Sequence, residues 1–255
     1  MTKLLGLPFL ASEHGAKVDH LILYMHWLMG VLFIGWMAYF VYVLIRFRKS
    51  RHPKASYQGA QTHASSYLEG AVALVEGILL MGFAIPWWAE AVDKFPSEKD
   101  ATVISVTAEQ FAWNSRYPGK DGIFGKQDVR FISASNPLGI DPQDPNAKDD
   151  IVPPLNEITV PINKPVIAYV TSKDVIHSFK INALRVTQDA IPGMKIPVWF
   201  KPTHEGQFLI NCAQLCGNSH YFMKGYLNVV SQEKYDQWLA EKSKTAGGAA
   251  TGGFE

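Results

Sequence analysis

LILYMHWLMGVLFIGWMAYFVYVLI, residues 21–45 of the 255-residue chain, is an apolar run whose only titratable side chains are His26 and three tyrosines. At about 1.5 Å per residue, a helix of this length crosses a bilayer core of about 30 Å with some tilt. The run therefore predicts a transmembrane helix over residues 21–46, in which we assign no role to His26.

A second apolar run follows over residues 70–89, GAVALVEGILLMGFAIPWWA. Its single charge is Glu76, and it ends in two tryptophans, Trp87 and Trp88, a residue type that is enriched at membrane interfaces. We predict a second transmembrane helix over residues 69–92. The alternative is a buried helical hairpin of a soluble protein, but two runs of this length within the first 92 residues favour a membrane hairpin.

The loop between the two spans, residues 47–68, sets the orientation of the hairpin. The chain is basic here and has no acidic residue between the first span and Glu69. The basic residues are Arg46, Arg48, Lys49, Arg51 and Lys54. The positive-inside rule places this loop in the cytoplasm, so residues 1–20 and the chain after the second span lie outside. The stretch Leu4–Ala11 could be the core of a short cleavable signal, and the sequence leaves processing open.

Residues 97–240 have the sequence pattern of an all-β domain, because short Val-, Ile- and Phe-rich segments alternate with Pro, Gly, Asn and Asp. Their number and spacing favour a sandwich or a Greek-key barrel. The predicted strands are Thr102–Ala108, Val129–Ile132, Glu157–Pro161, Val166–Thr171, Val198–Lys201, Gly206–Asn211 and Gly225–Val230. We expect residues 118–156 to be mostly loop around one hairpin, and Gln232–Lys242 to be a helix. The Gly/Ala-rich tail, taken as residues 241–255, is expected to be disordered from Thr245 onward.

The charge and cysteine content of the chain argue against two classes of protein, nucleic-acid-binding proteins and disulfide-framework proteins. The chain has 24 Lys+Arg against 23 Asp+Glu, a formal charge of +1, which gives no basic surface for nucleic acid. From residue 97 onward the charges also nearly cancel, so charge alone does not indicate where a protein partner docks. Two cysteines are too few for a disulfide framework in a chain of this length.

Residues 212–223, CAQLCGNSHYFM, place two thiols, an imidazole and a thioether within twelve residues. Two cysteines four residues apart could instead form a disulfide, because the outer compartment is oxidising. Gly217 allows a turn directly after the second thiol, so the donor groups can converge from one loop. Thiolate and thioether together are soft ligands that favour copper over magnesium, calcium or manganese. His177, in the segment DVIHSF, is a further candidate ligand next to a predicted strand.

The number of candidate ligands distinguishes the types of metal site. A mononuclear blue-copper site uses one Cys, two His and a weak axial ligand, which would leave one thiolate over. Two bridging thiolates, two imidazoles, one thioether and one backbone carbonyl can instead supply two copper ions with about four ligands each. A Cys₂His₂ zinc site is the remaining alternative, and it leaves Met223 unexplained.

Three blocks of sequence, residues 171–179, 189–193 and 212–223, closely resemble subunit II of the haem–copper cytochrome c oxidases. The two spans and residues 110–113 extend the likeness over nearly the whole chain. The resemblance implies a two-helix transmembrane hairpin followed by an all-β cupredoxin-like Greek-key domain that carries CuA, a binuclear copper centre. The ligands it implies are His177, Cys212, the main-chain carbonyl of Gln214, Cys216, His220 and Met223.

The chain departs from the family pattern at three positions. Gln214 stands where most members have a Glu whose side chain binds magnesium at the subunit I interface, and since a neutral amide is a weaker ligand we do not assign that ion. Phe111 stands where the family usually has the exposed Trp that accepts electrons, while Trp113 matches the second aromatic of the motif. Electron transfer into the site through Phe111 or Trp113 is a hypothesis, and simple packing of both rings is the alternative. Met194 replaces a common Arg.

Two carboxylates in the second span are candidate proton-path residues. By position, Glu69 matches a Glu at the cytoplasmic mouth of a proton path in the family, although it could be merely exposed at a helix end. Glu76 lies two helical turns further on, on roughly the same face. Because a carboxylate inside the membrane is costly unless it faces protein or water, we expect Glu76 to face subunit I.

The resemblance implies the electron-accepting subunit of a terminal oxidase in a bacterial inner membrane, with the copper domain and both termini periplasmic. Its partners would be membrane lipid, cytochrome c, subunit III and subunit I, which reduces O₂ to water while protons are pumped. No catalytic residue is expected in this chain. The chain has no Cys-x-x-Cys-His motif, so its electron donor would be a separate protein.

Three alternatives remain for the function. A structural subunit II of a quinol oxidase would keep the fold but lose the copper ligands. A membrane-anchored module that binds or delivers copper has no evident need for two spans with a buried Glu. Nitrous oxide reductase carries a similar loop together with a large catalytic domain that has no counterpart here.

Overall fold

The computed structural model describes residues 5–55, 57–59 and 61–244. The chain forms two units, an α-helical hairpin within Lys17–Asp93 and a β domain that begins at Lys94. A short N-terminal segment, Leu7–Ala16, belongs to the β domain. The predicted disorder of the tail from Thr245 onward lies outside the described residues.

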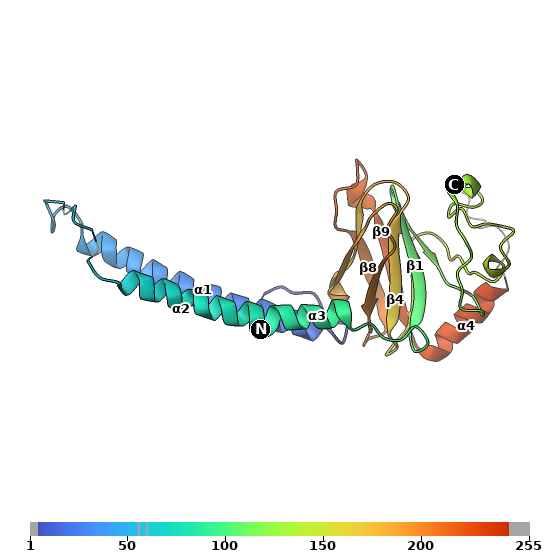
Figure 1. Cartoon of the computed structure of the whole chain (residues 1–255), viewed down its shortest axis with the longest axis horizontal. Helices are drawn as coiled ribbons and strands as arrows, with labels where there is room; N and C mark the ends of the chain where they lie inside the picture. Colours follow the sequence, from blue (N-terminus) through green and yellow to red (C-terminus); the bar gives the residue numbers. More distant parts are fainter. Residues whose placement is uncertain (1–4, 56, 60, 245–255) are drawn as a thin grey trace. The chain divides into compact units, whose positions relative to one another are not determined.

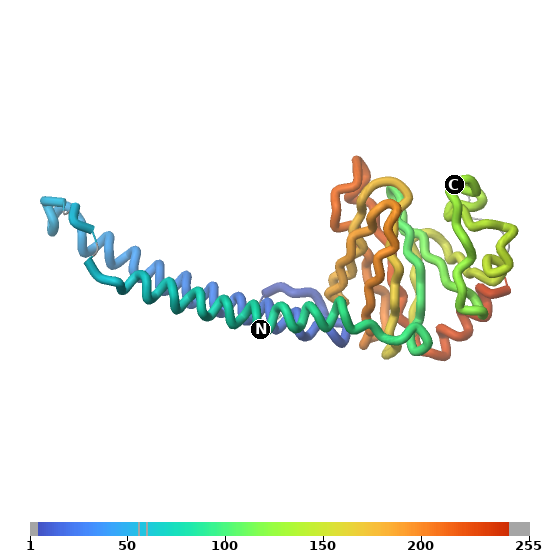
Figure 2. Tube along the Cα trace, viewed as in Figure 1, coloured from blue at the N-terminus to red at the C-terminus, as the bar shows by residue number. Residues whose placement is uncertain are grey.

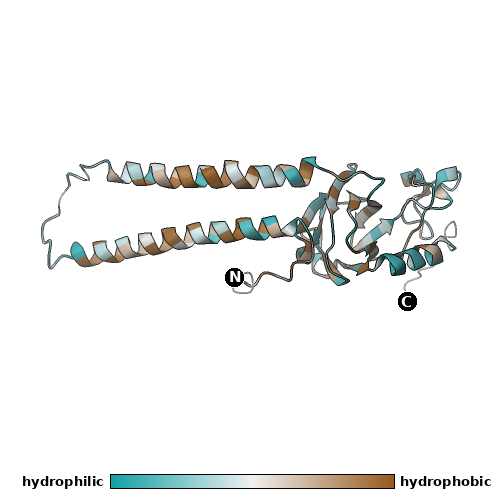
Figure 3. Ribbon diagram, turned by 90° about the horizontal axis from the view of Figure 1, so that it is seen from below, coloured by the Kyte–Doolittle hydropathy of each residue, from teal (hydrophilic) through white to brown (hydrophobic). Residues whose placement is uncertain are grey.

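The helical hairpin consists of two rods that are joined by the basic loop (Figure 1). The first is α1, Gly15–Arg46, which begins six residues before the predicted span. The second runs over Ala64–Asp93 as α2, Ala64–Leu79, a π-helical turn, Leu80–Ala84, and α3, Ile85–Asp93. Both rods are long and apolar enough to cross a membrane. Figure 3 shows hydrophobic residues along both helices, in contrast to the hydrophilic helix α4 of the β domain, Gln232–Ser243.

Aromatic side chains join the two rods at the end away from the basic loop. The ring of Tyr24 on α1 lies 5.7 Å from Phe83 and 6.4 Å from Trp87 on the second rod. Lys17 and Glu90 form an ion pair at the same end. These contacts fasten the first part of α1 to the second rod at this end.

The β domain is a sandwich of two sheets (Figure 1). The first sheet has the order β2–β1–β4–β7 and the second has the order β3–β9–β8–β5–β6. The strands are β1 Thr102–Glu109, β2 Ala112–Arg116, β3 Glu157–Pro161, β4 Val166–Ser172, β5 His177–Ile181, β6 Val186–Ala190, β7 Ile196–Phe200, β8 Gly206–Cys212 and β9 Lys224–Val230. This architecture confirms the predicted all-β cupredoxin-like domain after two apolar helices.

Long connections place distant strands side by side. β1 pairs in parallel with β4, from Thr102 opposite Val166 to Ala108 opposite Ser172, although residues 117–156 lie between these strands. β3 pairs in parallel with β9, and the remaining strand pairs are antiparallel. Figure 2 shows this path as a green strand beside a yellow one. Because neighbouring strands are often not consecutive in the chain, the connections are those of a Greek key rather than of a simple meander.

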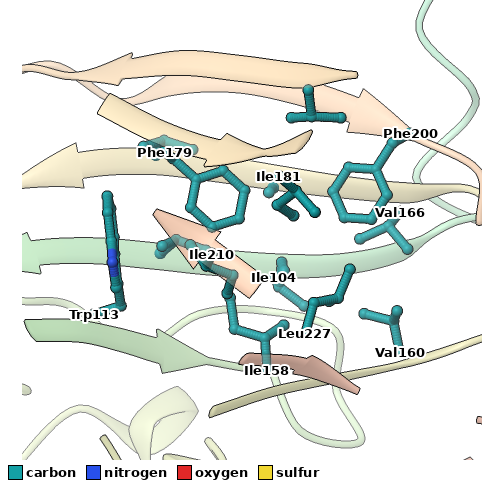
Figure 4. Close-up of a cluster of buried hydrophobic side chains, with 14 of the residues drawn as sticks. Ile104, Trp113, Ile158, Val160, Val166, Phe179, Ile181, Phe200, Ile210 and Leu227 are labelled. Carbon is teal, nitrogen blue, oxygen red and sulfur yellow. The ribbon is translucent and has the colours of Figure 1, made fainter. Parts of the chain in front are cut away.

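The core lies between the two sheets (Figure 4). Residues from both sheets, such as Ile104, Phe179 and Leu227, are fully buried there. Trp113 closes one end of this cluster, with its ring 5.5 Å from Phe179. At roughly 25 cal/mol per Å² of buried apolar area, this interface supplies the main stabilisation of the domain.

Six of the seven predicted strands coincide with observed strands to within two residues at each end, and the one at Val129–Ile132 is wrong. Residues Val129–Phe131 form a 3₁₀ turn that is capped by the Asp128 carboxylate, which accepts a hydrogen bond from the Arg130 backbone N–H. Local side-chain bonds of this kind compete with strand pairing. The expected hairpin in residues 118–156 is reduced to isolated bridges, such as Gln127 with Ile140.

Three of the observed strands, β2, β5 and β6, were not predicted. Each contains polar residues that obscure the alternation expected of a half-buried strand. In β2, for example, Asn114, Ser115 and Arg116 are all buried, and each has a polar partner. The Arg116 guanidinium forms a buried ion pair with Asp150 at 3.1 Å, which fastens the loop of residues 118–156 to the sandwich.

The N-terminal segment Leu7–Ala16, which we call the N-terminal strap, is built into the β domain. Ala11 is 0% exposed within the core, and its backbone N–H donates to the Ala183 carbonyl at 2.8 Å. The Ser12 hydroxyl donates to the Leu184 carbonyl at 2.6 Å. Gly15 has no space for a side chain, because an added Cβ would lie 2.5 Å from Leu10. These contacts make the N-terminal strap part of the β domain.

We expect Ala11→Asp to lower the free energy of unfolding of the β domain by at least about 2 kcal/mol, because it buries a carboxylate that has no partner. Ala240→Asp on the exposed side of α4 is the matched control and should have little effect. The measurement is thermal unfolding of the full chain in detergent, followed by circular dichroism. Equal effects of the two variants, or a purified protein whose mature N-terminus lies beyond Ser12, would contradict a structural role for the strap.

Candidate metal centre

All six ligands implied by the sequence converge at one end of the sandwich. His177 is the first residue of β5 and Cys212 is the last residue of β8. The two strands are neighbours, with Phe179 opposite Cys212. Gln214, Cys216, His220 and Met223 follow in the connection to β9, which we call the metal loop, residues 213–223. The sheet therefore places two donors rigidly, and the loop folds back over them.

Gly217 lets the metal loop turn directly after the second cysteine. Its φ is +138°, a conformation that disfavours residues with a side chain. An added Cβ would lie 2.7 Å from Gln110 Nε2 and 3.1 Å from the Phe111 ring. The glycine is thus required both by its backbone angle and by the close approach of the turn between β1 and β2.

The donor atoms lie within a few ångströms of one another. Cys212 Sγ is 3.8 Å from Cys216 Sγ and 3.1 Å from the main-chain oxygen of Gln214. His177 Nδ1 is 3.8 Å from Cys212 Sγ and 3.1 Å from Met223 Sδ. On the other side of the cluster, Cys216 Sγ is 3.5 Å from His220 Nδ1 and 3.7 Å from Met223 Sδ. Both sulfurs therefore lie between the two imidazoles.

Burial divides the donors into an inner and an outer group. The inner group is buried: His177 is 0% exposed, Met223 2% and Cys216 4%. Cys212 and His220 are partly exposed, and Gln214 is exposed. A metal ion can therefore approach from the solvent side, while the inner donors are held by the core.

Asp174 sets the orientation of the His177 ring. Its Oδ1 lies 2.8 Å from His177 Nε2, so the proton of the neutral imidazole is held on Nε2 and the lone pair of Nδ1 faces the sulfurs. A carboxylate on the outer nitrogen of a histidine ligand is the usual means of fixing its tautomer and raising its basicity. The ring packs on its other side against Trp113, with the ring centroids 6.3 Å apart.

The two thiols differ in their pKa values. Burial opposes ionisation of Cys212, but its hydrogen bonds with His177 and with backbone groups outweigh burial and lower the pKa of this thiol. Burial and the neighbouring Cys212 thiolate raise the pKa of Cys216. In the absence of metal, one of the two thiols therefore tends to stay protonated. A bound metal cation would release this proton, because metals bind the thiolate form of cysteine.

The geometry distinguishes the alternatives for this cluster. The cysteines are free thiols with Sγ atoms 3.8 Å apart, whereas a disulfide bond is about 2.0 Å long. A Cys₂His₂ zinc site would use four ligands, but the buried Met223 sulfur and the Gln214 carbonyl also point into the cluster. Two thiolates, two imidazoles, a thioether and a carbonyl form a soft set with enough donors for two copper ions.

The remaining predicted site residues lie in different environments. Phe111 is partly exposed beside Gly217 at the metal loop, whereas Trp113 is 1% exposed and lies in the core. Glu69 and Glu76 are on the helical hairpin, with exposed side chains; Glu76 lies just before the π-helical turn. They belong to the other unit of the chain.

Two residues that contact the site were missed as site residues. Asp174 stands three residues before His177, and this spacing, a carboxylate close to a candidate ligand, is a signal that could have revealed it. Gln110 contacts the metal loop through a hydrogen bond from its side-chain amide to the Cys216 carbonyl. No local signal predicts that contact, because 106 residues separate the two partners.

Comparison with known proteins places the chain in a family. The profile described as "Cytochrome C oxidase subunit II, periplasmic domain" matches residues 102–230. "Alternative cytochrome c oxidase subunit 2" of Bradyrhizobium diazoefficiens is 32% identical over 230 residues, covering 90% of this chain and 82% of the relative. "Cytochrome c oxidase subunit 2" of Cereibacter sphaeroides is 32% identical over 230 residues, covering 85% of this chain and 75% of the relative.

Among solved structures, the periplasmic domain of subunit II of the cytochrome oxidase of Bradyrhizobium japonicum is similar, with 31% sequence identity and a TM-score of 0.43. The match covers 59% of this chain and 98% of that domain. The profile spans half of the chain, and both curated relatives are matched over at least three quarters of their length. The chain therefore belongs to the cytochrome c oxidase subunit II family of the haem–copper oxidases.

Proposed function

We propose that this chain is the subunit through which electrons enter a terminal cytochrome c oxidase. Its metal cluster would hold the binuclear CuA centre, accept electrons from cytochrome c and pass them to haem in subunit I. There O₂ would be reduced to water with coupled proton pumping. The alternatives, a structural subunit of a quinol oxidase or a copper-delivery module, find no specific support in the cluster.

One observation carries this proposal: six donors of the right chemistry converge without a disulfide. The two copper ions would be held together by Cys212, Cys216, His177, His220, Met223 and the main-chain carbonyl of Gln214. When bound, such a pair supplies one-electron transfer, with the electron shared over both ions. The buried inner donors would limit movement of the ligands on reduction.

Phe111 is the better candidate of the two aromatics for accepting electrons from a docked donor. It is partly exposed and lies against the metal loop at Gly217. Trp113 is buried against His177, so it would hold the imidazole in place rather than meet a partner. The metal loop also exposes Leu215, Tyr221 and Phe222, which together offer an apolar surface for docking.

Glu69 and Glu76 would act in a proton path with subunit I. Both side chains are exposed on the helical hairpin, in a mostly apolar part of the second rod. An intramembrane carboxylate is unfavourable unless it faces protein or water, so we place this side of the second helix against the partner subunit. The interface magnesium of the family is not part of the proposal, because Gln214 offers only a neutral side chain.

The proposed location is a bacterial inner membrane. The helical hairpin would span the bilayer, with the basic loop of residues 47–68 in the cytoplasm. The β domain and both termini would lie on the periplasmic side. The partners would be subunit I, subunit III, cytochrome c and lipid.

We expect the full chain, loaded with copper, to bind two copper ions and to give an electron paramagnetic resonance spectrum of one electron shared over two copper nuclei. Cys216→Ser should abolish this sharing, because it removes a bridging sulfur. Met223→Leu should keep a perturbed binuclear centre with a shifted potential. Metal analysis, the spectrum and a redox titration test all three expectations. The full chain is required because a segment that starts at Ser97 lacks the N-terminal strap. A single copper with the pattern of one nucleus would reject the proposal.

For the electron path, we expect Phe111→Ala to slow reduction of the centre by ferrocytochrome c about tenfold, because it removes an aromatic contact between donor and metal loop. The copper content should not change, because Phe111 supplies no ligand atom, and the spectrum separates a slower rate from a displaced metal loop. Phe131→Ala, at a partly exposed Phe in the loop of residues 118–156, is the control. Stopped-flow absorbance measures the rate, and equal rates in the two variants would exclude Phe111 from the path.

For the proton path, we expect Glu69→Gln to lower steady-state oxygen consumption of the assembled oxidase several-fold, because the amide cannot carry a proton. Reduction of the copper centre should remain at the rate of the unaltered protein, and Glu69→Asp should restore part of the turnover. An oxygen electrode and stopped-flow absorbance separate the two steps. Unchanged oxygen consumption in Glu69→Gln would remove this residue from the proton path.

A further inference from the structure

The turn between β1 and β2 brings Gln110 against two separate parts of the metal site. Its backbone N–H donates to Asp174 Oδ2 at 2.7 Å, and its side-chain amide donates to the Cys216 carbonyl. The other oxygen of Asp174 lies 2.8 Å from His177 Nε2. A continuous chain of hydrogen bonds therefore runs from His177 through Asp174 and Gln110 to Cys216.

We propose that Gln110 and Asp174 form a positioning brace, which fixes the distance and orientation of His177 relative to Cys216. The proposal rests on the copper-binding function proposed above, and it adds two residues that bind no metal themselves. Neither residue belongs to the ligand set. Their role is to hold two ligands that come from different parts of the fold.

The brace joins the two sheets of the sandwich. Gln110 follows β1 of the first sheet, whereas His177 on β5 and the metal loop after β8 belong to the second. Cys212 is already placed by pairing of β8 with β5, but Cys216 lies four residues beyond the end of β8. The Gln110 amide thus supplies, from across the sandwich, a fixed point for the part of the loop that carries the second thiol.

Steric contact reinforces the hydrogen bonds. The space above Gly217 is filled by Gln110 Nε2 and by the Phe111 ring, so the loop cannot shift toward this turn. Asp174 is itself held, because its Oδ1 accepts from the Val175 backbone N–H at 2.7 Å. A carboxylate with several fixed donors has little freedom to rotate, and it therefore orients the His177 ring firmly.

The two halves of the brace should have different electronic effects. Asp174 brings a negative charge to the outer nitrogen of His177, which stabilises the oxidised, more positive form of the centre. Gln110 is neutral and acts by geometry alone. Loss of Asp174 should therefore raise the reduction potential, while loss of the Gln110 amide should mainly increase the spread of ligand positions.

The test uses Asp174→Asn, Gln110→Leu and the double variant in the full copper-loaded chain. The chain offers a matched control pair, since Gln232 Nε2 donates to Asp236 Oδ1 at 2.8 Å on α4, away from the metal loop. Gln232→Leu and Asp236→Asn make the same chemical changes there. Three quantities are measured for each protein: copper retention against a chelator, the resonance spectrum and the reduction potential.

We expect each site variant to lose copper to the chelator at least about tenfold more readily, as is typical when a partner of a metal ligand is removed. The hyperfine pattern should broaden in both, and only Asp174→Asn should raise the potential markedly. The double variant should lose less affinity than the product of the two single effects, because both residues act in one chain of contacts. The control variants should match the unaltered protein in all three measurements.

Site variants that match the unaltered protein would overturn the brace while leaving the copper function intact, and strictly multiplicative losses would show that the two residues act independently. If the unaltered chain itself binds no copper pair, the proposed function fails, and the brace fails with it. Thermal unfolding of the metal-free proteins checks that the variants fold. Should Gln110→Leu not fold, Gln110→Asn keeps the amide but is one methylene too short to reach Cys216, and the same losses are expected.

Discussion

The candidate metal site depends on a single constraint: two thiols must lie close together without joining to each other. The sulfurs of Cys212 and Cys216 are held 3.8 Å apart because one ends a strand and the other sits in a loop that is anchored independently. Pairing of β8 with β5 fixes the first thiol beside His177. The turn at Gly217 and its contact with Gln110 fix the second. The sandwich is thus a frame that keeps reactive groups at a set distance.

The sandwich also determines which donors of the cluster are buried, and burial sets the cost of charge there. Inner donors are buried, so an unpaired charge among them would be costly, and the carboxylate of Asp174 offsets the positive charge that a metal brings. Outer donors remain accessible, which allows metal to enter after folding. Trp113 separates the cluster from the rest of the core by filling the end of the sandwich.

Much of this structure could be predicted from sequence, because the informative signals are local. The two apolar runs predicted the helices, and the twelve residues from Cys212 to Met223 predicted a common site for four donors. His177 could be added because it lies beside a predicted strand, and the Gln214 carbonyl could be added on the strength of the family resemblance. In contrast, β2 and β5 carry buried polar residues, such as Arg116, whose partner Asp150 lies 34 residues away, and β6 has polar side chains at its three middle positions. The strand expected at Val129–Ile132 failed for the opposite reason, since the local cap of Asp128 overrides an apolar pattern.

The N-terminal strap links the order of synthesis to the completion of the domain. Its Ser12 bonds to Leu184, 172 residues later, so the strap finds its partner only after the two helices and most of the β domain have been made. Contacts of such long range are slow to form because a large loop must close first. Until the strap docks, the part of the core that packs against Ala11 is exposed to solvent. Completion of the β domain therefore has to wait for the two helices that lie in the sequence between the strap and its strands.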